Sequence, residues 1–277
     1  MRIDMHVHIG YALGWDMTED MVLQSMEKYN IDFSIVSNTE SVKYDHDFKE
    51  VPKEMQHTQI ESLKRSIDFA RRFPDKIGVM PWIRPESERL SKEFKEYIID
   101  NLDIIYGIKM HPYHSHLAFD SNNLYEYLDL AEELNLPVLI HTGGCDEASP
   151  ERVYNMALKY PKVNFIMGHM ELGTDNENAI NYISKLPNLY GDTAWVPIES
   201  IIKAIKTFGS EKILFGSDNP IDGVDTYHHN PKGEPSLYQK YFNDLKDMIS
   251  KKDYDNIMYK NSIKLFNLNK ILKLKRL

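Results

Sequence analysis

The chain has 277 residues, of which 42% are hydrophobic and 27% charged, and its formal net charge is −9 at pH 7. These proportions are ordinary for a globular protein, and the length predicts one domain over residues 1–277, because β/α barrels have about 250 residues. The acidic balance argues against a nucleic acid as partner, since a phosphate backbone needs a basic surface. Cys145 is the only cysteine, which excludes a disulfide within the chain and predicts a reducing, cytoplasmic location. The sequence has no apolar run long enough to cross a bilayer, so we expect no membrane partner.

Short apolar or β-branched runs alternate with helical patterns along the whole chain. Most of these runs are apolar throughout, as buried parallel strands are. The expected strands cover residues 2–8, 32–37, 76–83, 105–110, 137–142, 163–168, 188–194 and 213–217. Eight strands that alternate with helices predict an α/β fold, a (β/α)8 TIM barrel. A doubly wound open sheet is the alternative fold.

Helical patterns occupy the segments between the expected strands. Apolar side chains recur at helical spacing on three stripes, Ile60-Leu63-Ile67-Ala70, Leu124-Leu128-Ala131 and Ile198-Ile201-Ile202-Ile205. Ser149-Pro150-Glu151 predicts a helix start, because a capping residue precedes a proline in the first turn. Two connections after strand ends, residues 38–56 and 219–235, are longer than a barrel needs. We expect them to shape the substrate site, because the loops at this end of a barrel build the active site.

The first expected strand ends with two histidines. In Asp4-Met5-His6-Val7-His8, residues 4, 6 and 8 share a face because side chains alternate along a strand. Both imidazoles are therefore expected to point into the mouth of the barrel, which suits two ligands of one metal. Taken alone, the motif also fits two ordinary polar residues at a strand end.

A lysine interrupts the fourth expected strand. Lys109 lies in the otherwise apolar run from Gly107 to Met110, and burying a lysine is costly unless it is paired or chemically modified. One interpretation is an inward salt bridge to a carboxylate at a strand end. The functional interpretations are a carbamate that bridges two metals, or a cation for a substrate carboxylate.

Three other expected strands end in residues of metal-ligand type, namely His141, His169 and Asp218. Each alone could be a rim residue or a helix cap. The carboxyl ends of all strands in a barrel meet at one rim, however, so these side chains should converge with His6 and His8. Neutral imidazoles and a carboxylate form a zinc-type ligand set. The sequence therefore predicts a metal centre at this rim.

In chain order, these motifs resemble the amidohydrolase superfamily, and more closely its amidohydrolase-related branch. The resemblance covers nearly the whole chain. It rests on Asp4-Met5-His6-Val7-His8, Gly107-Ile108-Lys109-Met110-His111-Pro112, residues 136–143, 164–170, 189–193 and 213–218, and the closing residues 259–266. One departure is Met170-Glu171, where the branch usually has Met-Gly.

The resemblance implies a divalent metal, with zinc the favoured ion, held by His6, His8, His141 and Asp218. The position of His169 is a ligand of a second metal in some members and a catalytic histidine beside a single metal in others. Lys109 matches in type the carbamylated lysine of dihydroorotase-like members, so both one and two ions stay open. The branch often forms dimers, which makes a homodimer one expected assembly.

The resulting hypothesis is a metal-dependent hydrolase of a small amide, cyclic amide, lactone or ester. A divalent metal lowers the pKa of bound water to about 7. Asp218 would then move the protons, and His169 would help to polarise the carbonyl. Lys109, His111 or Arg84 would bind an anionic group of this small-molecule substrate.

Three other functions stay open. A non-oxidative decarboxylase of the aminocarboxymuconate semialdehyde decarboxylase type uses one metal on nearly the same ligands. A phosphoesterase is less favoured, because barrel nucleases usually carry a glutamate where this chain has Lys109 and because the net charge is negative. A barrel that binds a metabolite without catalysis is disfavoured, since a metal with an open position is reactive.

Several other side chains are expected at or near the rim. Asp192 is expected to support the site through hydrogen bonds rather than to catalyse. The pair His228-His229 is expected to lie on solvated surface. Side chains that could line the cavity are Trp15, Trp82, Trp195, His114 and His116.

Overall fold

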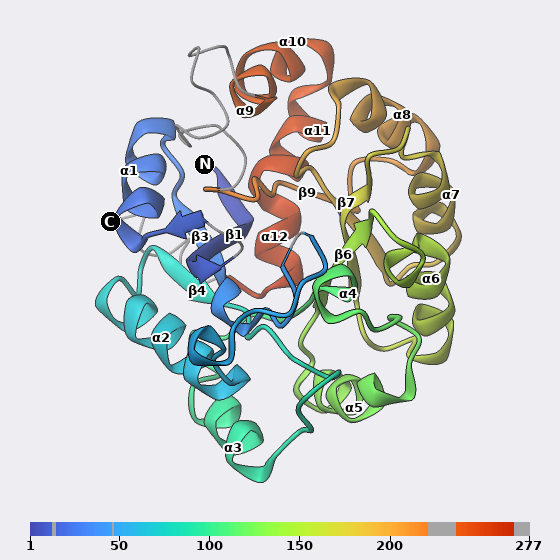
Figure 1. Cartoon of the computed structure of the whole chain (residues 1–277). Coiled ribbons are helices and arrows are strands. Elements are labelled where there is room, and N and C mark those ends of the chain that lie inside the picture. Colours follow the sequence, from blue (N-terminus) through green and yellow to red (C-terminus); the bar gives the residue numbers. More distant parts are fainter. Residues whose placement is uncertain (13–14, 46, 221–236, 269–277) are drawn as a thin grey trace.

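The computed structural model describes residues 1–12, 15–45, 47–220 and 237–268. In this part of the chain, parallel strands lie at the centre and helices form a ring around them (Figure 1). The eight parallel strands are β1 (Ile3–Ala12), β3 (Phe33–Asn38), β4 (Ile77–Val79), β5 (Ile108–Met110), β6 (Val138–Gly143), β7 (Phe165–Leu172), β8 (Leu189–Asp192) and β9 (Ile213–Leu214). A further short strand, β2 (Trp15–Met17), pairs antiparallel with the end of β1.

Backbone contacts join two hydrogen-bonded sheets into one cylinder. The sheets have the orders β2-β1-β3-β4 and β5-β6-β7-β8-β9. At one joint, parallel bridges connect Val79 to Ile105 and Trp82 to Lys109. At the other, the Met5 amide donates to the Phe215 carbonyl oxygen (3.0 Å). The predicted TIM barrel is therefore confirmed, and the open sheet is not the fold.

Helices cover the outside of the cylinder. They are α1 (Glu19–Tyr29), α2 (Gln59–Arg72), α3 (Lys92–Asp100), α4 (Pro112–Ser115), α5 (Tyr125–Leu134), α6 (Pro150–Lys159), α7 (Glu177–Lys185), α8 (Ile198–Phe208), α9 (Leu237–Lys240), α10 (Lys246–Met248), α11 (Lys251–Asp255) and α12 (Asn261–Leu265). Short 3-10 turns occur at Thr39–Ser41, Lys53–Met55, Asn122–Leu124 and Asp146–Ala148, and π-helical turns at Tyr241–Leu245 and Asn256–Lys260. None of the described helices is both long and apolar enough to span a membrane.

Local sequence signals explain where these helices begin and which face they bury. Helix α2 starts with a capping box, in which the Thr58 side chain and the Glu61 side chain each bind the other residue's backbone amide. Its predicted stripe faces inward, since Leu63, Ile67 and Ala70 are buried. Helix α6 begins at Pro150, as the proline predicts.

Two apolar layers separate the inside of the barrel from the outside. The inner cluster includes Met5, Ile35, Leu139, Ile166 and Leu214, one from each of five strands. The outer cluster packs the other strand face against the helices, and it is larger. The inner cluster forms an apolar floor below the carboxyl ends of the strands, which is where the polar side chains begin.

A bulge in β1 decides which side chains face inward. Ile3 and Met5 belong to the inner cluster, so Asp4 points outward. The ladder with β3 then shifts between Asp4 and Val7, which turns His6 and His8 inward. The expectation that Asp4 shares their face is therefore wrong. Its carboxylate instead accepts a hydrogen bond from the Ser217 amide (2.9 Å).

Candidate metal centre

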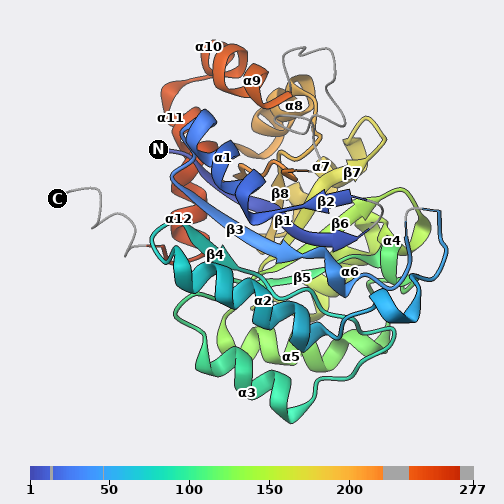
Figure 2. The ribbon, with the colours of Figure 1, turned by 60° about the vertical axis from the view of Figure 1, so that its left-hand side comes forward.

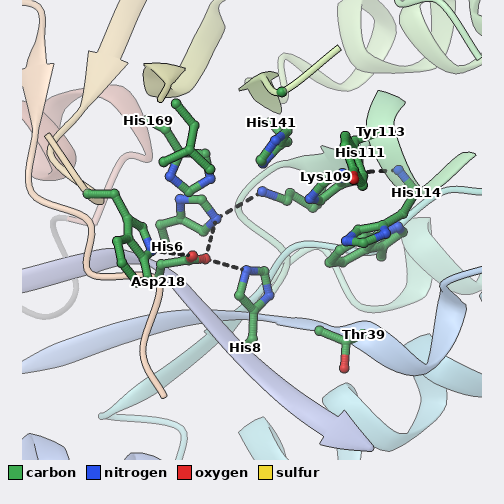
Figure 3. A pocket seen from close by; sticks show the side chains of 14 residues that line it. His6, His8, Thr39, Lys109, His111, Tyr113, His114, His141, His169 and Asp218 are labelled. Atoms are coloured by element: carbon green, nitrogen blue, oxygen red, sulfur yellow. Dashed lines mark hydrogen bonds and ion pairs between the residues drawn. The ribbon is translucent and has the colours of Figure 1, made fainter. Parts of the chain in front are cut away.

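A cavity of about 330 Å³ lies at the carboxyl ends of the barrel strands. Figure 2 shows β1 and β3 running toward the end of the molecule at which α4 lies. The cavity is lined by seven of the eight side chains that the sequence assigned to the site, namely His6, His8, Lys109, His111, His141, His169 and Asp218. Figure 3 shows that these side chains approach one another from different strands.

The two histidines of β1 present the same ring nitrogen to the cavity. His6 Nδ1 lies 2.6 Å from Asp192 Oδ2, and His8 Nδ1 lies 3.3 Å from the Ser37 carbonyl oxygen. Because the Asp192 oxygen accepts, His6 carries its hydrogen on Nδ1 and keeps an electron pair on Nε2. His8 faces an acceptor at both nitrogens, Ser37 at Nδ1 and Asp218 Oδ1 at Nε2 (2.9 Å). The tautomer with its hydrogen on Nδ1 is the one that binds a metal through Nε2.

His169 has the same tautomer and shares the support of Asp192. Its Nδ1 lies 3.1 Å from the Ala194 carbonyl oxygen, and its backbone amide donates to Asp192 Oδ1 (2.8 Å). Asp192 thus binds His6 with one carboxylate oxygen and His169 with the other. These are the hydrogen bonds that its predicted supporting role requires.

Asp218 completes this group from the end of β9. The Trp195 indole donates to its Oδ2 (2.8 Å), and its backbone amide donates to the His6 carbonyl oxygen (2.7 Å). Burial opposes its ionisation, yet the rings of His6, His8 and His169 hold the pKa of this carboxyl well below its usual range. Asp218 is therefore a carboxylate at neutral pH.

The donor atoms fit a divalent metal. His6 Nε2 and His8 Nε2 lie 3.3 and 2.9 Å from Asp218 Oδ1. Electron pairs that face a carboxylate oxygen at these distances repel it unless they share a proton or a cation. Donor atoms of His6, His169 and Asp218 all lie within 4.8 Å of one another. Neutral imidazoles and a carboxylate are ligands that suit zinc and related ions.

Burial favours the neutral form of three imidazoles of the cavity. It lowers the pKa of His6 and His141 well below the usual value, and the pKa of His169 falls in the same direction. Only an unprotonated imidazole nitrogen can bind a metal, so the site is prepared for one near neutral pH.

Lys109 occupies the centre of this arrangement. Its side chain is fully buried, and Nζ lies 2.9 Å from His6 Nε2. This contact is to an imidazole nitrogen, whereas one interpretation of the sequence expected a carboxylate. Burial lowers the pKa of Lys109 to about 8, although Asp218 and Asp192 oppose the shift. One electron pair cannot serve both partners, so a metal bound at His6 Nε2 would displace the Lys109 ammonium.

Stacked rings form the wall opposite Asp218. The His111 ring stacks on Trp82 (centroids 5.3 Å apart) and on His141 (3.9 Å), with interplanar angles of 8° and 15°. The His114 amide donates to His111 Nδ1 (3.4 Å), which leaves the hydrogen of His111 on Nε2. His111 is thus a hydrogen-bond donor rather than a metal ligand in this tautomer.

Arg84 is the one predicted site residue that does not line the cavity. Its guanidinium donates to the His57 carbonyl oxygen and lies 3.4 Å from Glu88. The reason is local, because the Arg84 carbonyl oxygen accepts from the amides of Ser87 and Glu88 and so starts a turn. The strand alternation that would aim Arg84 into the mouth ends there.

The other side chains that were expected near the rim lie in different places. Trp82, Trp195 and His114 line the cavity, whereas His116 stacks on Tyr44 outside it. His228, His229, the Trp15 side chain and the connection from residue 221 to 235 lie outside the described part of the chain. Thr39, Tyr113, Gly144 and Leu172 also line the cavity. Leu172 ends β7 and the other three follow strand ends, which was the available signal, but their side-chain types carry no chemical pattern.

The chain was compared with known proteins. A family model described as amidohydrolase matches residues 3–268. No curated protein matches the chain by sequence. Among solved structures, 2,6-dihydroxybenzoate decarboxylase from Rhizobium has a TM-score of 0.67 at 16% identity, covering 97% of this chain and 99% of that one.

Two other solved structures have similar overlap. 5-Carboxyvanillate decarboxylase from Novosphingobium aromaticivorans, with bound manganese, has a TM-score of 0.73 at 11% identity, covering 96% of this chain and 97% of that one. A probable 2-pyrone-4,6-dicarboxylic acid hydrolase from Acinetobacter baumannii has a TM-score of 0.66 at 15% identity, covering 96% and 99%. At these identities the likeness demonstrates a shared fold.

Proposed function

The chain belongs to the amidohydrolase family, and from this premise we propose that it is a metal-dependent decarboxylase of a small hydroxylated aromatic carboxylate. The observation that carries the proposal is the composition of the cavity wall. Among the described residues that line it, Asp218 is the only carboxylate, and it faces six histidines and Lys109. Such a wall suits an anionic substrate, and the stacked rings suit a planar one.

The structural neighbours also favour decarboxylation, whereas the sequence alone favoured hydrolysis. Decarboxylases of dihydroxybenzoate and of carboxyvanillate share this fold over nearly the full chain. Their substrates are hydroxylated aromatic acids, and a cavity of about 330 Å³ is within the range of small-molecule sites. We therefore place decarboxylation first.

The reaction exchanges a carbon–carbon bond for a carbon–hydrogen bond. The electron pair of the broken bond stays on the ring, carbon dioxide leaves, and one proton must reach the same ring carbon. Asp218 is the carboxylate available for this step, and Trp195 orients it through Oδ2. In our proposal it takes the proton of the neighbouring substrate hydroxyl and delivers it to the ring carbon. The product oxygen regains a proton from water on release.

The other residues bind and orient the substrate. The hydrogen on His111 Nε2 can be donated to a substrate oxygen, and the flat face of Trp82 backs the His111 ring. Lys109, displaced from His6 Nε2 when a metal binds, would hold the substrate carboxylate or neutralise its charge. His169, whose hydrogen lies on Nδ1, would hold the metal through the electron pair on Nε2.

The residues that would hold the ion are His6, His8, His141, His169 and Asp218. When bound, a divalent ion would supply positive charge that binds the substrate oxygens and stabilises negative charge on the ring. Imidazole and carboxylate ligands suit both zinc and manganese. We propose manganese as the first ion to test, because two of the neighbouring decarboxylases carry it, and zinc as the second.

Hydrolysis of a lactone is the second candidate function. A probable 2-pyrone-4,6-dicarboxylic acid hydrolase has the same fold, and its substrate is also a planar carboxylate. The same wall of donors would accept it. The two reactions differ in their products, because hydrolysis adds water and releases no carbon dioxide.

The test uses the protein stripped of metal and reloaded with Mn²⁺ or Zn²⁺. It is incubated with a panel of 2-hydroxybenzoates labelled with ¹³C in the carboxyl group, and with planar lactones in ¹⁸O-water. We expect ¹³CO₂ from at least one acid, and we expect the rate to fall by about 10²–10⁴-fold in Asp218→Asn. Asp129→Asn, on the outer face of α5, is the control and should retain the rate. Incorporation of ¹⁸O into an opened lactone without ¹³CO₂ from any acid would replace our proposal with the hydrolase.

A further inference from the structure

Strand β7 contains an unusual turn at its functional end. His169, Met170 and Glu171 have φ angles of 65°, 44° and 73°. Residues other than glycine avoid this left-handed region, because the Cβ atom approaches the following carbonyl oxygen. The ladder with β6 shifts here, since His141 pairs with Gly168 whereas Gly143 pairs with Leu172. The turn is therefore a bulge that moves His169 out of regular strand geometry.

The two ends of the turn are held by neighbouring strands. Thr142 Oγ1 donates to the Gly168 carbonyl oxygen (2.7 Å) and accepts from the Glu171 amide (2.8 Å). Asp192 accepts from the His169 amide (2.8 Å). These contacts leave the carbonyl groups of the turn itself to be satisfied from another direction.

Asn176 satisfies these carbonyl groups. Its side-chain nitrogen donates to the carbonyl oxygens of His169 (3.2 Å) and Met170 (2.7 Å). The residue is 2% exposed, and its Oδ1 has no hydrogen-bond partner among the described residues. The two carbonyl contacts therefore determine how the amide is oriented. Because this buried amide makes hydrogen bonds only through its nitrogen, it stabilises the turn in which both carbonyl oxygens face it.

This stabilisation has a consequence for the metal centre. In regular strand geometry the His169 carbonyl would point along the sheet, and its side chain would take a different direction. In the observed turn, His169 Nδ1 donates to the Ala194 carbonyl oxygen, and the ring lies 5.1 Å from His6 and 4.7 Å from His141. The direction of the His169 side chain thus depends on backbone contacts made by His169 itself and by the residue that follows it.

We propose that Asn176 is a positioning residue, whose side-chain amide holds the left-handed turn that aims His169 into the cavity. The inference rests on the proposed function for its effect on catalysis. Its effect on the His169 ring is independent of that function. Two measurements are therefore needed, one on the reaction and one on the ring.

The first measurement compares two variants that each remove one buried amide. Asn176→Gly deletes the side chain and tolerates the positive φ of 63° at this residue. The control is Asn261→Ala, because Asn261 Nδ2 also donates to two carbonyl oxygens, those of Ser210 and Ile213 (both 2.7 Å). Asn261 has a helical backbone, which alanine suits, and it lies at the start of α12.

Both variants should lower the melting temperature, but only Asn176→Gly should slow the reaction. We expect its kcat to fall by about 10–100-fold with KM changed less than about threefold, because the substrate-binding wall is untouched. The double variant with His169→Asn should be no slower than His169→Asn alone, since both changes remove the same group. Equal kcat in Asn176→Gly and Asn261→Ala, or multiplied losses in the double variant, would overturn the proposal.

The second measurement observes the ring without turnover. In metal-free protein with ¹⁵N-labelled histidine, the His169 signals are identified by their loss in His169→Asn. The wild type should show the hydrogen on Nδ1, and Asn176→Gly should shift these signals or mix the two tautomers, whereas Asn261→Ala should not. Unchanged His169 signals in Asn176→Gly would refute the positioning role. Shifted signals in a protein that releases no carbon dioxide would instead refute the proposed function and leave the positioning role intact.

Discussion

Asp192 joins two ligand candidates that lie far apart in the sequence. One of its carboxylate oxygens fixes the tautomer of His6, and the other accepts from the backbone of His169. The group is fully buried, so the cost of ionising it in the barrel must be offset by these contacts. Carboxylates that bind the second nitrogen of a ligand histidine typically change metal affinity by 10–100-fold.

Replacing Asp192 by asparagine should therefore weaken metal binding by about 10–100-fold. Asparagine has a single acceptor oxygen, so it cannot accept from both His6 Nδ1–H and the His169 amide, and one of these two supports is lost. The measurement is competition between the protein and a chelating dye for Mn²⁺. Asp129→Asn, which removes the charge of a carboxylate on α5 that accepts from the Tyr160 hydroxyl, should leave the affinity unchanged. Equal affinities in the two variants would contradict the role of Asp192.

For single residues, the sequence predicted which side chains line the cavity better than it predicted which atoms those side chains contact. His6, His8, His141, His169 and Asp218 all line one cavity, as predicted. Pattern alone could not show that Lys109 contacts an imidazole, because that depends on the distance across the barrel between β1 and β5. Arg84 was misplaced because a turn begins at its carbonyl and ends the strand alternation there, as the following Pro85 could have signalled.

The segment that follows β9 packs tightly against β1 beside the site. A Cβ atom on Gly216 would lie 2.8 Å from His6 Cβ and 3.3 Å from Asp192 Oδ2. Neither neighbour can retreat, since both side chains are held in the centre of the barrel. Glycine is required here by the close approach of β9 to β1.

Gly216→Ala should lower stability by about 1–3 kcal/mol through overpacking and should also displace His6. Metal affinity should fall with it. Gly78→Ala is the control, because its Cβ would crowd the Tyr106 ring near the start of β4, away from the cavity. Urea unfolding should show a loss of stability in both variants. Competition for Mn²⁺ should show a loss of affinity in Gly216→Ala alone. Unchanged Mn²⁺ affinity in Gly216→Ala would count against the tight packing of His6.

The connection between β4 and α3 contains a buried carboxyl group. Glu86 accepts from the Ser87 hydroxyl and lies 3.7 Å from Arg84, and its Oε2 has no partner among the described residues. Burial raises the pKa of Glu86 above its ordinary value of 4.5, although Arg84 opposes the shift. The folded protein therefore keeps this proton at a pH where the unfolded chain has lost it.

Stability should consequently fall as pH rises from about 4.5 to the raised pKa of Glu86, and the loss should stay constant above it. Glu86→Gln cannot ionise, so its free energy of unfolding should gain on the wild type across this window. Urea unfolding in the presence of a chelator, at several pH values between 4 and 8, measures the difference. A difference that is independent of pH would contradict the assignment.

Element positions were predictable to within a few residues because buried parallel strands leave an apolar signal. The strand expected at 137–142 is observed at Val138–Gly143, and that expected at 32–37 is observed at Phe33–Asn38. The bulges were not predictable. They depend on pairing between strands, as in the shift that reverses Asp4 and His6, and no periodicity within one strand encodes them.

At the scale of the whole molecule, metal binding should raise the melting temperature of the protein. The proposed ligands lie on β1, β6 and β7 and just after β9, so an ion would connect both halves of the barrel. At a hundredfold excess over the dissociation constant, binding stabilises the folded state by about 2.7 kcal/mol, which predicts a rise in melting temperature of roughly 5–10 °C. Mg²⁺ prefers oxygen ligands and should have little effect. Scanning calorimetry after chelation and reloading tests this, and equal effects of Mg²⁺ and Mn²⁺ would disagree with the proposed ligands.

The most direct test is an anomalous diffraction map of crystals grown with Mn²⁺. Our account predicts a single strong peak in the cavity, about 2.0–2.3 Å from Nε2 of His6 and His8 and from the Asp218 carboxylate, with Lys109 moved away from His6. A cavity without a peak at saturating Mn²⁺, with Lys109 Nζ still bound to His6 Nε2, would contradict it.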